Sequence, residues 1–470
     1  MNLNSTVLIF LLGNLSFNTS AMALDIRDSL QNGTTSKLLK NSKHESARWT
    51  GVGLLSTIDG TCSAALLDTR KGGAKATGPA YLITSGHCIT KEIGTSTLNY
   101  KLDATVTFNY FNDTTKHHKT YKVHTANWTS MVGTDLAILE VEKTLDQLMQ
   151  DGITPLRLAP LPPLGAHDVL NVGIPRTTPE QGLRVSACTQ EISTTLSGVP
   201  PTFPGGLVNG CKNLAPGSSG SPMLDRRTNK ITSIISENNY GFSPSFLSNC
   251  FRNGVFTNNT ETCELQQVNV EVDFLSLFKT KVRPTWNSVG YEILPTWDYK
   301  FKIDTPYYRY KTVRDAMNCD NPDNYSGAIN GSYGHITQSI GPEPRMHILC
   351  IIGVHSEKQK LTRTLLKNVF THAVHLAEPA PKPTFNLLTN QRTSITWADS
   401  YPVFTSHFFY AGPADTTQCG DVEDKRYKKA LSVEILPSYL PLKVCSYGQN
   451  ETAFQPSAIR FDLIRAPLAP

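Results

Sequence analysis

Apolar and polar residues alternate along most of this chain in short runs, and residues that favour turns separate the runs. Residues 105–110 (Thr-Val-Thr-Phe-Asn-Tyr) and residues 230–235 (Lys-Ile-Thr-Ser-Ile-Ile) are examples. A period of two is typical of strands that bury one face, and frequent turns between strands are typical of antiparallel sheets. The pattern predicts an all-β fold with two antiparallel β-barrels over residues 49–281, rather than alternating strands and helices.

The second half of the chain contains an internal repeat. Residues 283–287 (Arg-Pro-Thr-Trp-Asn) recur as residues 382–386 (Lys-Pro-Thr-Phe-Asn). A tyrosine and two cysteines follow in each copy: Tyr310, Cys319 and Cys350 in the first, Tyr410, Cys419 and Cys445 in the second. Two units with alternating strands and a pair of cysteines each resemble immunoglobulin- or fibronectin-type β-sandwiches. We therefore expect β-sandwich modules at 282–378 and 379–470; the alternative is a chance similarity between two β segments.

The N-terminus resembles an export signal. Residues 7–12 form an apolar run too short to cross a bilayer, and Ala21-Met22-Ala23 is a small-residue cleavage site. We expect a signal peptide over residues 1–23, with an uncleaved anchor as the alternative because no Lys or Arg precedes the run. Polar residues 24–48 are predicted to be the pro-segment of a zymogen, cleaved near Arg48, or a disordered arm. The mature protein is expected to be secreted, to an extracellular or periplasmic space, without a membrane span.

Composition excludes several classes of protein. The chain has 470 residues, of which 39% are hydrophobic and 18% charged, so it has enough apolar residues for several packed domains. A net charge of +5 over this length is small. Nucleic-acid and membrane-surface binding are therefore not predicted, because such proteins concentrate Lys and Arg on one face.

Ten cysteines, an even number, favour disulfides in an exported chain. None forms a Cys-x-x-Cys pair, which makes a zinc site a poor alternative. Pairing in chain order gives Cys188–Cys211, Cys250–Cys263, Cys319–Cys350 and Cys419–Cys445, although other connectivities stay open. The internal repeat supports the last two pairs.

Two further groups of residues have an ordinary structural interpretation beside a functional one. Aromatic residues in the predicted modules could bind a glycan or a cell-surface protein, but strand alternation places about half of them in the core. They are Tyr307, Tyr308, Phe408 and Phe409. Five histidines lack Cys or acidic partners at ligand spacing, so we interpret them as loop or strand residues and expect no metal. They are His117, His118, His124, His372 and His375.

Three short motifs carry residues suited to nucleophilic catalysis. They are Ile83-Thr84-Ser85-Gly86-His87-Cys88, Thr134-Asp135-Leu136-Ala137-Ile138-Leu139 and Pro216-Gly217-Ser218-Ser219-Gly220-Ser221-Pro222. A serine hydroxyl such as that of Ser219 needs a neighbouring base, and the imidazole of His87 titrates near neutrality. Asp135 is predicted to orient His87 and to be buried. Each motif alone is weak, since Gly-Ser-Ser-Gly is usually a flexible turn, but the three together predict a hydrolase.

The order His87, Asp135, Ser219 and the three motifs resemble the chymotrypsin/trypsin family of serine peptidases, in which a histidine, an aspartate and a serine form the catalytic triad in this chain order. Other hydrolase classes carry their triads in other orders. The resemblance implies an active site between two barrels, an acyl-enzyme intermediate, and an oxyanion hole made by the N–H groups of Gly217 and Ser219. It also implies a Cys62–Cys88 disulfide beside His87, protein or peptide substrates and no cofactor.

The sequence departs from the trypsin-like pattern both at the residue before Ser219 and at the specificity pocket. Ser218 replaces the aspartate that pairs with the new N-terminus in trypsin-like zymogens, which is closer to bacterial glutamyl-endopeptidase-like members. Asn213 stands at the floor of the predicted pocket, so a preference for Lys or Arg is not supported. Ser236 and Asn238 resemble the strand that binds the substrate backbone, but the histidine of a glutamyl endopeptidase is missing there. Cleavage specificity stays open.

Two other functions compete with a serine endopeptidase. The first is a catalytically silent homologue that acts as an extracellular binding or adhesion protein through its C-terminal modules. Such homologues usually lose a triad residue, and none is missing here. The second is a lipase or esterase, which is disfavoured because Gly217-x-Ser219-x-Ser221 lacks the final glycine of a nucleophile elbow.

Overall fold

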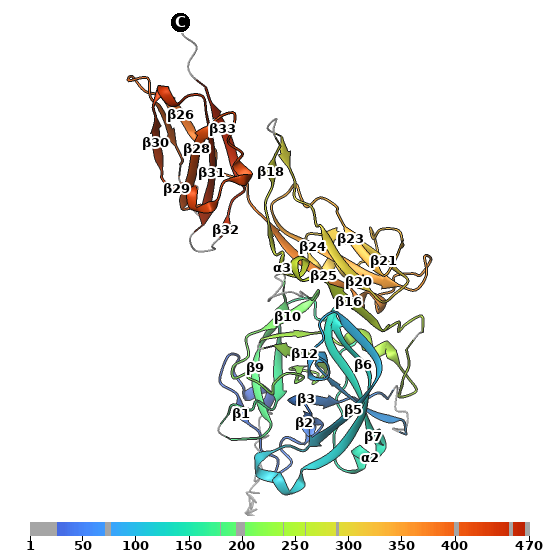
Figure 1. Ribbon diagram of the computed structural model, residues 1–470. Coiled ribbons are helices and arrows are strands. Elements are labelled where there is room, and N and C mark those ends of the chain that lie inside the picture. Colours follow the sequence, from blue (N-terminus) through green and yellow to red (C-terminus); the bar gives the residue numbers. More distant parts are fainter. Residues whose placement is uncertain are drawn as a thin grey trace, which may run out of the picture.

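The structure is a computed structural model that is mostly β, with two closed six-stranded antiparallel barrels followed by further sheets (Figure 1). It describes residues 26–70, 77–178, 180–193, 203–237, 239–258, 260–287, 291–398, 404–450 and 455–465. The predicted signal peptide lies outside these residues. Within the described part of the chain, no helix has the length and apolar character needed to cross a bilayer. The α-helices are short: α1 (Ile26–Ser29), α2 (Leu145–Gln150) and α3 (Phe274–Phe278).

The first barrel is closed because β5, the last of its six strands in spatial order, pairs with the first strand, β2. In spatial order its strands are β2 (Val52–Thr57), β3 (Gly60–Leu66), β4 (Pro79–Thr84), β7 (Thr134–Thr144), β6 (Lys119–Val132) and β5 (Thr95–Phe108). Apolar side chains such as Leu55, Val106 and Leu139 fill its interior. The predicted alternation of buried and exposed positions is visible at the end of β5, where Ala104, Val106 and Phe108 are buried.

The second barrel closes in the same way, through the pairing of β8 with β9. Its strands are β8 (His167–Gly173), β9 (Arg184–Ile192), β10 (Gly206–Asn209), β13 (Tyr240–Phe242), β12 (Ile231–Glu237) and β11 (Pro222–Asp225). One hydrophobic cluster joins Ile83 and Ile138 of the first barrel to Leu170 and Ile234 of the second. This shared core holds the barrels against each other. Two small strands follow, β14 (Phe251–Arg252) and β15 (Val255–Phe256).

The described part of the N-terminal arm packs on the second barrel. Its strand β1 (Lys37–Leu38) pairs with β9, and Leu30 and Leu39 are buried in the core shared by the barrels. The side chain of Arg226 donates hydrogen bonds to the main-chain oxygens of Arg27 and Leu30. These contacts join the described residues of the arm to the second barrel, whereas removal of the arm as a pro-segment stays a prediction.

The first C-terminal module shares a strand with the first barrel. The beginning of β16 (Val268–Val272) pairs with β5, and its end pairs with β20 (Tyr299–Ile303). The sheet continues to β23 (Tyr333–Ile336), and a hydrophobic cluster separates it from a second sheet. That second sheet consists of β17 (Lys281–Val282), β25 (Phe370–Leu376), β24 (Arg345–Val354), β21 (Tyr307–Val313) and β22 (Ile329–Asn330).

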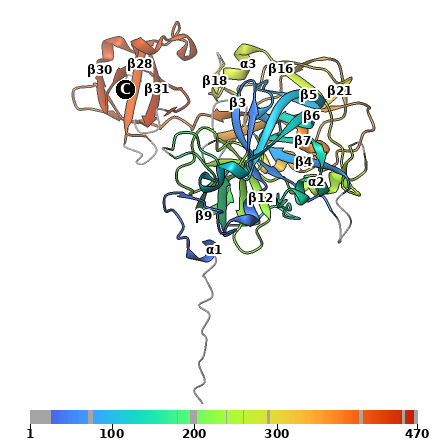
Figure 2. The ribbon, with the colours of Figure 1, turned by 90° about the horizontal axis from the view of Figure 1, so that it is seen from below.

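The second C-terminal module also has two sheets around an apolar core, and it stands away from the barrels (Figures 1 and 2). One sheet has β26 (Thr384–Leu387), β27 (Thr393–Thr396) and β30 (Ser432–Ile435). The other has β29 (Lys428–Lys429), β28 (Ser406–Pro413), β31 (Leu442–Asn450), β32 (Gln455–Pro456) and β33 (Arg460–Ile464). The hairpin of β18 (Thr285–Trp286) and β19 (Glu292–Ile293) reaches this module, where Trp286 Nε1 donates to the oxygen of Ile459 at 2.5 Å.

The two modules have corresponding parts. In each, the strand that carries the repeat tyrosine pairs with the strand that carries the second cysteine: β21 with β24, and β28 with β31. Disulfides Cys319–Cys350 and Cys419–Cys445 close the two units. The aromatic residues proposed as a ligand surface are partly committed to packing: Tyr308 is 4% exposed, and Phe408 stacks on Tyr447 with ring centres 5.1 Å apart. The immunoglobulin or fibronectin name of these modules stays a prediction.

Candidate active site

His87 lies in a short 3-10 turn, Gly86–Cys88, between β4 and β5. The turn packs so closely on the end of β6 that a Cβ on Gly86 would lie 2.0 Å from the oxygen of Ser130. A disulfide from Cys88 to Cys62 ties the same turn to β3. The glycine and the disulfide together fix the place of the imidazole.

Asp135 is the second residue of β7 and is 1% exposed. Its Oδ2 lies 2.7 Å from Nδ1 of His87, and its Oδ1 accepts the main-chain N–H of His87 at 2.8 Å. The hydroxyl of Ser236, in β12, donates to the same Oδ2. Three donors therefore compensate the desolvation of this carboxylate, and they orient the imidazole with Nδ1 toward Asp135.

Two opposing effects set the pKa of His87. Burial disfavours the charged imidazolium, but the charge of Asp135, its hydrogen bond and the more distant charge of Glu237 outweigh burial, so the pKa lies above its usual 6.5. An imidazole of this kind takes up a proton readily while remaining able to release it near neutrality.

Ser219 lies in the turn between β10 and β11, and its hydroxyl donates to the main-chain oxygen of Ser236 at 3.1 Å. Gly220 beside it has φ +80°, and a Cβ there would lie 2.0 Å from the oxygen of Ser63. The N–H of Ser63 donates to the oxygen of Ser219 at 2.8 Å. The turn is thus held against β3 of the first barrel, and Ser219 is linked to His87 through Ser236 and Asp135.

The turn before Ser219 presents main-chain donors. Gly217 has φ +96°, and its oxygen accepts the hydroxyl of Ser63 at 2.8 Å. Among the residues that the structure describes, the N–H groups of Gly217 and Ser219 have no hydrogen-bond acceptor. The N–H groups of Ser218 and Gly220, in contrast, donate to the oxygens of Ala215 and Ile235. Two unpaired donors near a serine hydroxyl are suited to binding a negatively charged oxygen.

Asn213, a predicted site residue, and Ser218, which stands in place of the zymogen aspartate, both have polar contacts. Asn213 has φ +61°, and its Oδ1 accepts the N–H of Ser36 in the arm at 2.9 Å. Ser218 is buried, and its hydroxyl accepts the N–H of Ala215 at 3.2 Å, so its described contacts give no support to a zymogen ion pair. Asn238 lies outside the described residues.

Two residues near the site have roles that the sequence did not predict. Ser63 bridges the barrels, since its hydroxyl also accepts the N–H of Ile174 at 3.0 Å. Glu237 raises the pKa of His87, and only its place next to Ser236 could have indicated this. The cysteines beside His87 are joined in a disulfide, so they supply no thiolates for a metal.

Part of the chain matches a known protein family. Residues 60–233 match the trypsin-like peptidase domain family, so the chain carries a trypsin-like peptidase domain. No curated protein matches the chain. Among solved structures, the thermostable serine protease AL20 from an extremophilic microorganism has 18% identity, covering 42% of this chain and 92% of that chain with a TM-score of 0.32. Protease Anisep from Arthrobacter nicotinovorans has 18% identity, covering 42% and 91% with a TM-score of 0.30.

Proposed function

We propose that this chain is a serine endopeptidase in which Ser219 attacks the scissile carbonyl and His87 accepts its proton. The observation that carries the proposal is the hydrogen-bonded series from Ser219 through Ser236 and Asp135 to His87. In the proposed reaction, the Ser219 hydroxyl leaves the Ser236 oxygen and donates to the imidazole of His87. His87 would then return the proton to the leaving amine, and water would hydrolyse the acyl-enzyme in the same two steps.

The N–H groups of Gly217 and Ser219 would stabilise the negatively charged oxygen of the tetrahedral intermediate. Their lack of acceptors among the described residues supports this role, because a preorganised donor loses no hydrogen bond when the oxyanion forms. Asp135 would hold the imidazole tautomer and stabilise the imidazolium. No cofactor takes part in this chemistry. The substrates are proteins or peptides, as the peptidase domain implies.

The covalent bonds of the chain support an oxidising compartment for the proposed enzyme. Five disulfides join the ten cysteines in chain order, including Cys62–Cys88, and such a set persists in an oxidising environment. Together with the predicted signal peptide, this supports a secreted enzyme. The competing function, a silent homologue that binds or adheres through the C-terminal modules, is not favoured by any contact described above.

A fluorophosphonate probe tests the proposal directly. We expect the probe to form an adduct at Ser219, located by peptide mass spectrometry, in the folded wild-type protein and not in Ser219→Ala or His87→Ala. His124→Ala is the matched control, because this histidine lies on β6 with its side chain 50% exposed and should not affect labelling. Absence of labelling in folded protein, before and after limited proteolysis near Arg48, would favour the silent homologue.

A further inference from the structure

The turn that precedes Asp135 is embedded in the first C-terminal module. β6 ends at Val132 and β7 begins at Thr134, so Gly133 alone joins the two strands, and Asp135 is the second residue of β7. Val132 is 1% exposed and belongs to the hydrophobic cluster of the module, together with Tyr299 and Phe370. A side chain close to the site is therefore packed in a core outside both barrels.

Gly133 brings the main chains of the two units into contact. It has φ +71°, and a Cβ there would lie 2.2 Å from the oxygen of Lys367 and 2.9 Å from the nitrogen of Val369. Only glycine tolerates both this conformation and this approach. The short 3-10 helix Leu365–Asn368 of the module thus lies directly against the turn.

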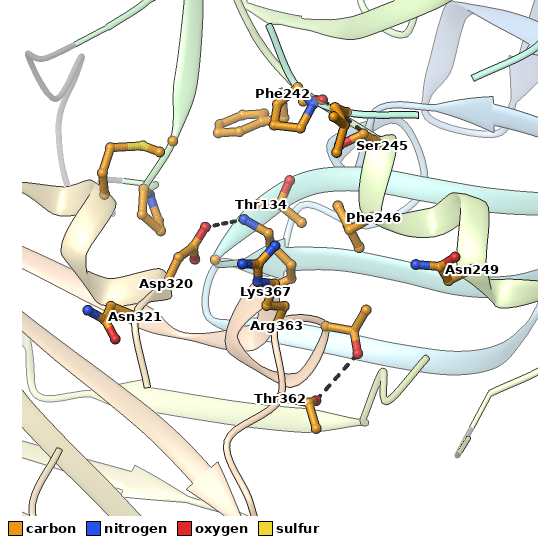
Figure 3. Close-up of a pocket in the computed structure, with 18 of the residues that line it drawn as sticks. Thr134, Phe242, Ser245, Phe246, Asn249, Asp320, Asn321, Thr362, Arg363 and Lys367 are labelled. Carbon is orange, nitrogen blue, oxygen red and sulfur yellow. Dashed lines mark hydrogen bonds and ion pairs between the residues drawn. The ribbon is translucent and has the colours of Figure 1, made fainter. Parts of the chain in front are cut away.

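Polar contacts also join the segment before this helix to Glu264, which lies in the chain between the barrels and the module. The N–H of Glu264 donates to Oγ1 of Thr364 at 2.9 Å. The carboxylate of Glu264 accepts hydrogen bonds from Thr362 and Gln359, each at 2.8 Å. Figure 3 shows the ion pair of Lys367 with Asp320 beside Thr134, in a cavity of about 840 Å³ that the module and the barrels line together. The helix that contacts Gly133 is therefore held both by Glu264 and by the ion pair within the module.

The same end of β6 also supports His87. The oxygen of Ser130 lies against Gly86, as described above, and the oxygen of Met131 accepts the N–H of Gly94 at 2.9 Å. The oxygen of Gly94 in turn accepts the N–H of Val270, in the strand shared with the module. Displacement of residues 130–133 would thus disturb the place of the imidazole as well as that of the carboxylate.

We propose that the first C-terminal module is a positioning element of the peptidase, which holds the His87–Asp135 pair in register through its contact with Gly133. The inference rests on the proposed function and goes beyond it, because it makes activity depend on a module with no residue at the reacting atoms. Gly133 and Val132 are positioning residues in this view. Their loss should lower kcat more than it raises KM, because the substrate-binding strand is not part of the contact.

The test is Gly133→Ala in the full chain, with Gly152→Ala as the matched control. Gly152 also has a left-handed φ, +83°, but nothing lies within 4 Å of its Cβ position, so the control carries the same backbone strain without the clash. We expect Gly133→Ala to reduce kcat and the rate of fluorophosphonate labelling by on the order of 100-fold. The pH profile of kcat/KM should also move to lower pH, because His87 loses the charge of a displaced Asp135 while remaining buried.

A second variant keeps the inference testable if Gly133→Ala fails to fold. Val132→Ala removes apolar contacts with the module while leaving the backbone free to adopt its native conformation, and we expect a smaller change of the same kind. Wild-type labelling rate and an unshifted pH profile in folded Gly133→Ala, or in folded Val132→Ala, would overturn the positioning role and leave the proposed function intact. Failure of the wild-type protein to label would instead reject the proposed function.

Discussion

The hydroxyl of Ser236 donates to Oδ2 of Asp135, the same oxygen that contacts Nδ1 of His87. One carboxylate oxygen thus connects the strand predicted to bind substrate with the imidazole. The main-chain oxygen of Ser236 also accepts the hydroxyl of Ser219. Ser236 therefore contacts two of the three proposed catalytic residues without taking part in proton transfer.

We predict that Ser236→Ala lowers both stability and activity. The buried carboxylate of Asp135 would lose one of three donors, which costs about 1.5–3 kcal/mol for a hydrogen bond to a charged group. The imidazole would also be held less firmly, so kcat should fall. The free energy of unfolding, from denaturant titration, and steady-state kinetics measure the two effects.

Ser233→Ala is the control for this change. Ser233 lies on the same strand and is also buried, but its hydroxyl accepts a hydrogen bond from the neutral amide of Gln190 at 2.7 Å. We expect a loss of about 1 kcal/mol in stability and unchanged kcat. Equal effects of the two substitutions on kcat would show that the Ser236 hydroxyl has no special relation to the site.

The pH dependence of activity should report the raised pKa of His87. The imidazole must be neutral to accept the Ser219 proton, so kcat/KM should rise with pH through an apparent pKa above 6.5. Glu237→Gln removes a negative charge that favours the imidazolium. The pKa should then fall, and the ascending limb of the profile should move to lower pH.

The pH prediction has a charge-matched control in Glu271→Gln. Glu271 lies on β16 in an exposed ion pair with Lys302 and does not contribute to the pKa of His87. Its loss should leave the profile unchanged. A shift of the Glu237→Gln profile to higher pH would contradict the sign of the electrostatic argument, because a removed carboxylate cannot stabilise a cation.

Gly217→Ala should displace the N–H groups that we propose to bind the oxyanion. A Cβ at this position would lie 2.7 Å from the oxygen of Ile174 and 2.8 Å from Cγ of Arg176, so the turn must shift and carry its N–H with it. Loss of one such donor reduces kcat by about 100-fold or more. Gly254→Ala, with φ +81° and its nearest neighbour at 3.7 Å, is the control for backbone strain alone. Comparable kcat values for the two variants would argue against an oxyanion role.

Two disulfides provide an internally matched comparison. Cys62–Cys88 and Cys419–Cys445 both join residues with a sequence separation of 26, so each should contribute about 3 kcal/mol by loop closure. Replacing the first pair by alanine should also reduce labelling of Ser219, because the turn that carries His87 loses its link to β3. Replacing the second pair should destabilise only the second module. Equal labelling rates for the two double variants would contradict this division.

The sequence predicts features that depend on local chemistry, and the structure contains several of them. The two barrels follow from short alternating strands, and the disulfides pair in chain order. His87 and Asp135, chosen from separate motifs, are in hydrogen-bond contact. These features could be predicted because a strand period, a tight turn or a cysteine spacing depends on residues that are close together in the sequence.

Contacts between residues far apart in the sequence could not be predicted in the same way. Val132 looks like any strand residue in the sequence, and nothing nearby indicates that its partners are Tyr299 and Phe370 of a module far along the chain. Gly133 could be recognised as a turn glycine, but not as the site of close approach by Lys367. The shared strand β16 depends on the register of two sheets, which the packing of complete units determines.

The first barrel and the first C-terminal module share strand β16, and this affects how the protein unfolds. Val268 and Asn269 pair with the barrel strand β5, whereas Val270, Glu271 and Val272 pair with β20 of the module. Melting of the module would strip partners from a strand that extends the sheet of the barrel, so we expect the two to unfold as one cooperative block. A protease that trims the chain after β16 would leave an unpaired sheet edge, and such edges recruit other chains. We therefore expect degradation from the C-terminal side to produce a fragment that aggregates.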